Sequence, residues 1–270
     1  MVRSHAGEPN RSYSLMEEHC LGMTGIAVRF CIRAPHLNMC MRTVSQIDEI
    51  KTQINNPYAV DNFITNDNVS ELISLFETSN DKIHKNTGPV VVNADLTHPL
   101  FLEIIHKLKS IIGEFEITSA FFFRTDYPHI IHNDDTFELP CAYKGITIPL
   151  LLEGKFNVFP QLCFFDQFYF HGPAKFFKGD NNIPTYYNKQ VYDYADVDGL
   201  VDNRFDTATR LRYFSHLKPT WLDGLTLNSA LEWKPTRAII FDSVRLHCAS
   251  DFRKLGIKSK LGISIFTKRV

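Results

Sequence analysis

Two residues that are close in the chain and a third that is distant have side chains that could share one metal ion. Two of them, His132 and Asp134, are separated by a single asparagine in the segment 127–135. Side chains alternate between two faces along a β-strand, so this imidazole and this carboxylate would project to the same side. A proline and two adjacent isoleucines in the same segment disfavour a helix. We therefore predict that His132 and Asp134 face one metal ion.

A His-x-Asp pair is a weak signal by itself and needs a distant partner. His247 is that partner, because it follows an apolar strand-like run, 238–241, and a short polar loop. Two histidines and one carboxylate leave three coordination positions open, which is typical of non-haem Fe(II) oxygenases. We therefore predict that His132, Asp134 and His247 are the metal-binding and catalytic residues. His129 is interpreted as a neighbour of the site and not as a ligand.

An iron centre of this kind needs electrons to activate dioxygen. A 2-oxo acid that chelates the metal supplies two electrons when it loses CO2, and its far carboxylate must then be anchored. In the segment 258–267, strand alternation places Lys260, Gly262 and Ser264 on one face. A buried lysine beside a hydroxyl can hold a carboxylate through charge-assisted hydrogen bonds, and the glycine between them would leave room for the ligand. Lys258, on the same predicted face, stays an alternative to Lys260.

The order of these motifs resembles a known family. His132-x-Asp134 comes first, His247 follows a Pro-x-Arg-apolar-Phe-Asp strand, and Lys260-Leu-Gly-Ile-Ser-Ile-Phe ends the series. This order is similar to that of the 2-oxoglutarate/Fe(II)-dependent oxygenase superfamily, nearest in style to its prolyl-hydroxylase-like branch. The segment from Asn55 to Phe76 also resembles the entry strand and helix of that branch. The resemblance extends from there to the C-terminus.

The resemblance implies a fold, a reaction and residue roles. The fold would be mainly β with flanking helices, in the form of a double-stranded β-helix, or cupin-like jelly roll. The three ligands named above would bind Fe(II), and Lys260 would bind 2-oxoglutarate with the assistance of Ser264. Tyr143 would make a second contact to this co-substrate. The reaction would use O2 to hydroxylate an unactivated C–H bond, and the aspartate ligand favours hydroxylation over halogenation.

Two other classes of protein fit parts of the pattern. A cupin-like metal-binding protein or isomerase would hold an ion without 2-oxoglutarate and would not need the lysine anchor. A non-catalytic interaction module would bind no Fe(II), and the same residues would then be an exposed Asx turn at 133–135, a hydrogen-bonded His247 and solvated edge-strand lysines. The substrate is open among a small molecule, a free amino acid and a peptidyl side chain, and desaturation or cyclisation are alternative outcomes.

The elements that must position these residues are short β-type runs separated by turn residues. They are 115–124, 130–133, 146–152, 158–165, 238–241 and 258–267. This pattern of short strands separated by turns is typical of a jelly roll and not of an alternating βα fold. Two helices precede these runs, one capped within the segment 65–67 and apolar through Phe76, the other capped by Thr97 and ended by Gly113. We expect both helices to brace one side of a sheet.

Two parts of the chain have no clear period. Residues 1–42 mix Gly, Pro, His and Cys with short apolar patches, and we predict a poorly ordered or variable segment. A single oxygenase domain is expected over 43–270. Within it, the stretch 166–233 is rich in Tyr, Asp and Asn and is too long for a simple loop, so we predict an insertion that forms a lid or a substrate wall.

The composition indicates which classes of binding partner and which cellular compartment to expect. The chain has 29 Lys+Arg against 30 Asp+Glu, so a broad basic face is not expected, and neither is a nucleic-acid partner. Six cysteines without a CxxC pair suggest reduced thiols in a cytoplasmic protein. No run approaches the roughly 18 apolar residues of a membrane span, and no signal-peptide pattern is present. The sequence does not indicate an oligomeric state.

Overall fold

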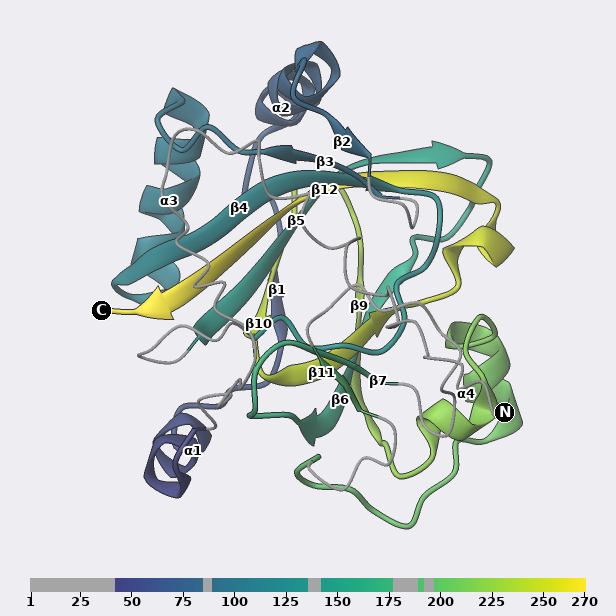
Figure 1. The fold of residues 1–270 in the computed structure, drawn as a ribbon. Helices are drawn as coiled ribbons and strands as arrows, with labels where there is room; N and C mark the ends of the chain where they lie inside the picture. The colour runs from purple at the N-terminus through teal and green to yellow at the C-terminus, as the bar shows by residue number, and fades with distance from the viewer. Residues whose placement is uncertain (1–41, 85–88, 136–141, 177–188, 192–196) are drawn as a thin grey trace, which may run out of the picture. The chain divides into compact units, whose positions relative to one another are not determined.

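The structure is a computed structural model that describes residues 42–84, 89–135, 142–176, 189–191 and 197–270. The N-terminal segment predicted to be poorly ordered lies outside these residues, except for Arg42. The described chain is mainly β with flanking helices, so the predicted fold class is confirmed (Figure 1). Within the described ranges, none of the helices is both long enough and apolar enough to cross a membrane.

The larger of two main sheets has seven strands in the order β1-β10-β5-β12-β4-β3-β2. Neighbouring strands in it are antiparallel throughout. The strands are β1 Tyr58–Val60, β2 Ile83–His84, β3 Val90–Asn93, β4 Phe115–Thr125, β5 Ala142–Gly154, β10 Ala238–Asp242 and β12 Ile257–Arg269. The long β12 lies between β4 and β5 and pairs with both along most of its length.

The smaller sheet contains β6 Gln161–Phe168, β9 Leu227–Glu232 and β11 Arg245–Ala249, in the order β11-β6-β9. A short parallel pair, β7 Ala174–Phe176 and β8 Lys189–Val191, lies next to it. His132 forms isolated antiparallel bridges to His247 in β11 and to Lys175 in β7. The segment around His132 therefore joins β7 to the smaller sheet.

The path of the chain between the two sheets is that of a double-stranded β-helix. From β4 it passes to the His132 segment in the smaller sheet, to β5 in the larger one, and then to β6 and β9 in the smaller one. It returns to the larger sheet in β10, crosses to β11 and ends in β12. Between the sheets lies an apolar cluster of Leu162, Phe164, Trp233, Ile239 and Phe241, called the inner cluster below.

The helices are α1 Val44–Lys51, α2 Asn66–Thr78, α3 Pro99–Ile112 and α4 Thr207–Tyr213, with short 3-10 helices η1 Pro219–Leu222 and η2 Phe252–Leu255. The buried faces of α2 and α3 pack on alternate residues of β5 and β12, on the side of the larger sheet away from the inner cluster. Figure 1 shows both helices on that side of β4 and β3. They brace the sheet as predicted.

The ends of α2 and α3 follow local chemistry. The Thr65 hydroxyl accepts a hydrogen bond from the amide of Asn68, so the cap lies within the predicted segment 65–67 and Thr65 supplies it. Helix α3 ends at Gly113, whose φ of 83° suits a residue without a β-carbon. Its start differs from the prediction by one residue, because the His98 imidazole accepts from the amide of Leu100 and Thr97 is bound to Asp95 instead.

The stretch 166–233 is not all insertion, since it contains the end of β6 and the whole of β9. Its remaining described residues form a second core on the outer face of the smaller sheet. This core includes Phe176, Phe214, Leu217, Trp221, Leu222 and Leu225, packed against Cys163, Phe165, Leu246 and Cys248. The described part of this stretch therefore supports the strand that carries His247.

Candidate metal centre

The structure brings His132, Asp134 and His247 together between the two sheets. One potential ligand atom from each of them lies within 4.8 Å of the other two. The Nε2 atom of His132 is 3.6 Å from Asp134 Oδ1, and the Nε2 atom of His247 is 3.3 Å from Asp134 Oδ2. The two imidazole ring centroids are 4.3 Å apart. Residues separated by more than a hundred positions thus meet at one point.

Backbone pairing produces this convergence. His132 and His247 exchange two main-chain hydrogen bonds, of 3.0 and 2.9 Å, so they form a hydrogen-bonded antiparallel pair. Residues paired in this way project their side chains to the same face of a sheet. Asp134 lies two residues further along, and its amide donates to the Ser243 carbonyl at 2.8 Å. The three side chains therefore meet because His132 pairs with His247 and the chain stays hydrogen-bonded at Asp134 to the turn before β11.

Main-chain carbonyls orient both imidazole rings. The Nδ1 atom of His132 is 2.7 Å from the Ile130 carbonyl, and that of His247 is 3.0 Å from the Arg245 carbonyl. A carbonyl can only accept, so each contact keeps the proton on Nδ1 and leaves the Nε2 lone pair free for an ion. Both Nε2 atoms are the ring nitrogens that face Asp134.

The burial of the site favours protonation states that suit a metal ligand. Burial lowers the pKa of His132 well below its usual value, and the nearby His247 adds to this effect. For Asp134, burial raises the pKa, but the combined attraction of His247 and His132 outweighs it and the net shift is downward. His132 is therefore neutral and Asp134 ionised near neutral pH, as ligation requires.

The residues that alternate with the ligands hold the segment in place. Asn133 points away from the ligand face, where its side-chain amide donates to the carbonyls of Tyr169 and Gly172, at 3.1 and 3.0 Å. Its side-chain oxygen accepts from the amide of Ala174 at 2.8 Å. Asp135 is bound by the guanidinium of Arg42. These supporting roles were not predicted from the sequence, since nothing local identifies the distant partners.

As predicted, His129 lies beside the site and is not part of the ligand group. Its ring centroid is 5.4 Å from that of His132. Burial lowers the pKa of His129 to about 3, with smaller contributions from the nearby Lys260, Lys175 and His247. The His129 imidazole is therefore neutral.

Lys260 is buried on the inner face of the larger sheet, with 6% of its surface exposed. Its Nζ atom lies over three aromatic rings, 4.9 Å from the centroid of Trp233, 5.5 Å from Phe252 and 5.9 Å from Phe123. Burial lowers its pKa to about 8. Among the residues that the structure describes, Lys260 has neither an ion pair nor a side-chain hydrogen bond. A buried ammonium with unused donors fits a carboxylate.

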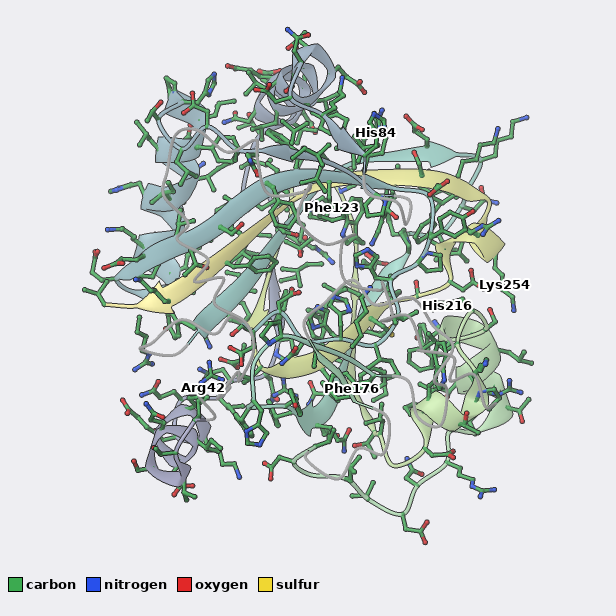
Figure 2. All side chains as sticks on the ribbon, viewed as in Figure 1. Arg42, His84, Phe123, Phe176, His216 and Lys254 are labelled. Atoms are coloured by element: carbon green, nitrogen blue, oxygen red, sulfur yellow. The ribbon has the colours of Figure 1, made fainter. Side chains whose placement is uncertain are left out.

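Lys260 and His247 face the same interior space. The Trp233 ring beneath the ammonium belongs to the inner cluster. In the same cluster, the rings of Phe241 and Phe164 lie 4.7 and 5.7 Å from His247. Phe123, labelled in Figure 2, packs against this cluster from the side of β4 that faces the smaller sheet. The Lys260 amine and the candidate ligand His247 thus border one aromatic interior.

The structure separates the two lysines that the sequence left as alternatives. Lys258 is exposed, whereas Lys260 is buried. The pairing of β12 with β5 shifts register between Ile257 and Ser259, so strict alternation fails at the start of the strand. Only Lys260 is therefore directed into the interior.

The space over Gly262 is filled and does not leave room for a ligand, in contrast to the prediction. A β-carbon at this position would lie 2.7 Å from Cζ2 of the Trp233 indole. The predicted alternation itself is correct, because Leu261 and Ile263 pack on the helix side. Ser264 is half-buried on the face of Lys260, but the indole edge lies over the glycine between them.

Tyr143 is not brought to the metal centre, which corrects its expected contact with the co-substrate. Its hydroxyl donates to the carbonyl of Ile112 in α3, at 2.9 Å. The ring packs against the core beneath α2 and α3, on the outer side of the larger sheet. Register shifts of β12 near the start of β5 decide which face this residue takes.

A cavity of about 610 Å³ opens beside the metal-binding segment. Its lining residues are Tyr127, Pro128, Ile130, His216, Asp251, Arg253 and Lys254. Ile130 belongs both to this wall and to the candidate site, because its carbonyl orients the ring of His132. Figure 2 shows His216 and Lys254 near each other at this side of the molecule. Ile130 therefore links the cavity wall to one candidate ligand, while His132, Asp134 and His247 do not themselves line the cavity.

No protein-family model and no curated protein matches the chain. Similar solved structures include HygX from Streptomyces hygroscopicus with nickel and 2-oxoglutarate bound, at 11% identity and a TM-score of 0.44 over 85% of this chain and 88% of that one. The non-heme alpha ketoglutarate dependent epimerase SnoN from nogalamycin biosynthesis is 11% identical, with a TM-score of 0.45 over 83% and 84%.

A further similar structure is the viral collagen prolyl hydroxylase vCPH from Paramecium Bursaria Chlorella virus-1, at 12% identity and a TM-score of 0.41 over 80% of this chain and 90% of that one. Each TM-score is below 0.5 and each identity is far below one quarter. The function proposed below therefore rests on the residues of this chain.

Proposed function

We propose that the chain is an Fe(II)- and 2-oxoglutarate-dependent dioxygenase that hydroxylates an unactivated C–H bond of a small molecule, an amino acid or a peptidyl side chain. The observation that carries the proposal is the meeting of His132, Asp134 and His247 beside an aromatic interior that also holds the buried Lys260. A structural metal site would be closed by its ligands, whereas this set leaves positions for a co-substrate and dioxygen.

The donor set fits Fe(II). Two imidazole nitrogens and one carboxylate oxygen form the facial triad of non-haem iron, and each histidine has the second hydrogen bond that fixes its tautomer. When bound, Fe(II) with 2-oxoglutarate supplies the electrons that activate O2. Asp134 contributes one negative charge towards the ion, and the rings of Phe164 and Phe241 exclude water from the side of His247.

Lys260 anchors the far carboxylate of 2-oxoglutarate in this proposal. The lysine is buried among aromatic rings, so a bound carboxylate would replace the water that the ammonium lost on folding. An ion pair in such surroundings is stronger than one at the surface and leaves the amine charged. Tyr143 has no part in this binding, because its hydroxyl is bound to α3.

The substrate enters through the cavity beside Ile130 in this proposal. This wall is shared with the metal-binding segment, and the cavity volume of about 610 Å³ lies in the range of small-molecule sites. Arg253 and Lys254 at its wall carry positive charge, and Asp251 carries negative charge. Charged side chains of both signs at the wall suit a polar molecule.

The test is an anaerobic titration with Fe(II) and 2-oxoglutarate. The expected result is a visible metal-to-ligand charge-transfer band that saturates at one 2-oxoglutarate per chain. A folded protein that binds Fe(II) but gives no band would support the alternative of a cupin-like metal protein or isomerase. Absence of Fe(II) binding by a folded sample would contradict any metal-dependent function.

A further inference from the structure

Trp233 carries a buried hydrogen-bond donor without an acceptor. The residue is 1% exposed, and among the described residues its indole Nε1 has no hydrogen-bond partner. Buried tryptophan N–H groups are normally paired, because an unpaired one costs about 1–3 kcal/mol. A donor of this kind inside the inner cluster indicates a ligand atom that the protein itself does not supply.

The position of the indole shows where that donor lies. Its Cζ2 atom is 2.7 Å from the place of a β-carbon on Gly262, and Cη2 is 3.3 Å from it. Nε1 is bonded to the ring carbon next to Cζ2, so the donor is on the edge of the ring that faces β12. The ammonium of Lys260 is 4.9 Å from the ring centroid. Both donors therefore belong to the same small region of the inner face.

Lys260 and Trp233 together form a site with donors and no acceptors. The aromatic rings around the ammonium stabilise its charge but offer no hydrogen-bond acceptor. Two unused donors that are both buried, one of them charged, match the two oxygens of a carboxylate. A neutral ligand would leave the ammonium unbalanced in this interior.

A third unpaired group lies in the same interior. Ser229 and His247 are both cross-strand partners of Phe164, so their side chains share its face of the smaller sheet. The Ser229 hydroxyl is buried and has no hydrogen-bond partner within the described part of the chain. Polar groups without protein partners thus continue from the region of the lysine towards the candidate metal ligands.

We propose that the Trp233 indole N–H donates a hydrogen bond to the far carboxylate of 2-oxoglutarate, beside the ion pair with Lys260. The inference rests on the proposed function and names the residue that takes the place expected for the Ser264 hydroxyl. It also assigns a specificity. A 2-oxo acid with a second carboxylate uses both donors, whereas pyruvate can chelate the metal but leaves both unpaired.

The first test observes the indole directly. The chain has two tryptophans, so a ¹H–¹⁵N spectrum contains two indole N–H signals, and Trp221→Phe removes the other one and assigns Trp233. In protein loaded with diamagnetic Zn(II), 2-oxoglutarate should move the Trp233 signal downfield, as a charged acceptor requires, and pyruvate should not. A Trp233 signal that stays in place at saturating 2-oxoglutarate overturns the inference.

The second test measures affinity by the anaerobic charge-transfer titration. Trp233→Phe should weaken 2-oxoglutarate binding about tenfold or more, the effect of losing one hydrogen bond to a charged group, and should leave pyruvate binding unchanged. Trp221→Phe is the matched control, because Trp221 lies in the second core, on the outer face of the smaller sheet. This variant should bind 2-oxoglutarate as the wild type does.

The outcomes separate the two proposals. A wild-type protein without a charge-transfer band overturns the proposed function and this inference with it. A wild-type band with equal 2-oxoglutarate affinity in Trp233→Phe overturns only the role of the indole. If Trp233→Phe does not fold, the indole signal of the wild type and of Trp221→Phe still decides the question.

Discussion

The guanidinium of Arg42 binds both carboxylate oxygens of Asp135, the residue that follows the candidate metal ligand Asp134. The two contacts measure 2.5 and 2.8 Å, and the side chains are 5% and 0% exposed. The same guanidinium donates to the Phe170 carbonyl at 2.9 Å, and the amide of Gly172 donates to Asp135 at 3.2 Å. The chain just before α1 is thereby joined to the metal-binding segment through one buried ion pair.

Replacing Arg42 with Gln should destabilise the protein strongly, because Asp135 would keep a buried charge without its partner. The expected loss in the free energy of unfolding is about 3–5 kcal/mol. Urea denaturation measures it. The control is Arg237→Gln, whose ion pair with the largely exposed Asp61 should be worth about 1 kcal/mol or less. Equal effects of the two substitutions would contradict a structural role for the buried pair.

Replacing any one of the candidate ligands should abolish tight Fe(II) binding. Replacing a neighbouring histidine that is not a ligand should leave the Fe(II) affinity unchanged. His132→Ala, Asp134→Ala and His247→Ala are each expected to weaken binding by roughly 100-fold or more, since loss of even a supporting group costs about 10–100-fold. His129→Ala is the matched control, because its ring is close to His132 but outside the ligand group. Anaerobic equilibrium dialysis with Fe(II) distinguishes them. Loss of iron in His129→Ala would require a different ligand set.

Lys260→Ala should remove 2-oxoglutarate binding and spare metal binding. The loss of a desolvated ion pair predicts roughly a 100-fold weaker affinity in the charge-transfer titration. Lys258→Ala, two residues earlier on the same strand but exposed, should bind 2-oxoglutarate normally. If both variants bind 2-oxoglutarate as the wild type does, the carboxylate is held elsewhere.

The affinity for 2-oxoglutarate should fall as the pH rises through about 8. Burial lowers the pKa of Lys260 to about 8, and only the charged amine binds a carboxylate strongly. The dissociation constant should therefore be nearly constant below that pH and should rise towards tenfold per pH unit well above it. Titrations on both sides of pH 8 measure this slope, and a flat profile would contradict the ionic anchor.

The Lys260 amine has the opposite effect on stability, because its contribution to the free energy of unfolding increases as the pH rises. Because the pKa of Lys260 in the folded protein, about 8, lies below the usual lysine value of 10.5, the unfolded chain binds more protons between these two values. The cost of burying the charge is therefore complete below about pH 8 and is relieved as the pH rises towards 10.5. Lys260→Met should remove this contribution to the pH dependence of the unfolding free energy.

Local periodicity, together with the order of the motifs along the chain, selected the candidate ligands. His132 and Asp134 are two residues apart, and the alternation of a strand places such side chains on one face whatever surrounds it. His247 could be chosen because its polar loop and preceding apolar run are also local patterns. The sequence by itself therefore determined the fold class, the helices α2 and α3, and the three side chains that the structure places together.

The tertiary structure decided everything that depends on register and on distant partners. A register shift near the start of β12 places Lys260, and not Lys258, in the interior. A second shift, near the start of β5, accompanies the orientation of the Tyr143 side chain towards α3. Trp233 came to fill the space over Gly262, and Arg42 came to hold Asp135. Strand alternation in the sequence does not reveal where a β-bulge shifts the register. No local pattern identifies which side chains pack across the barrel. Bulges and packing partners are both set by the pairing of strands that are far apart in the chain.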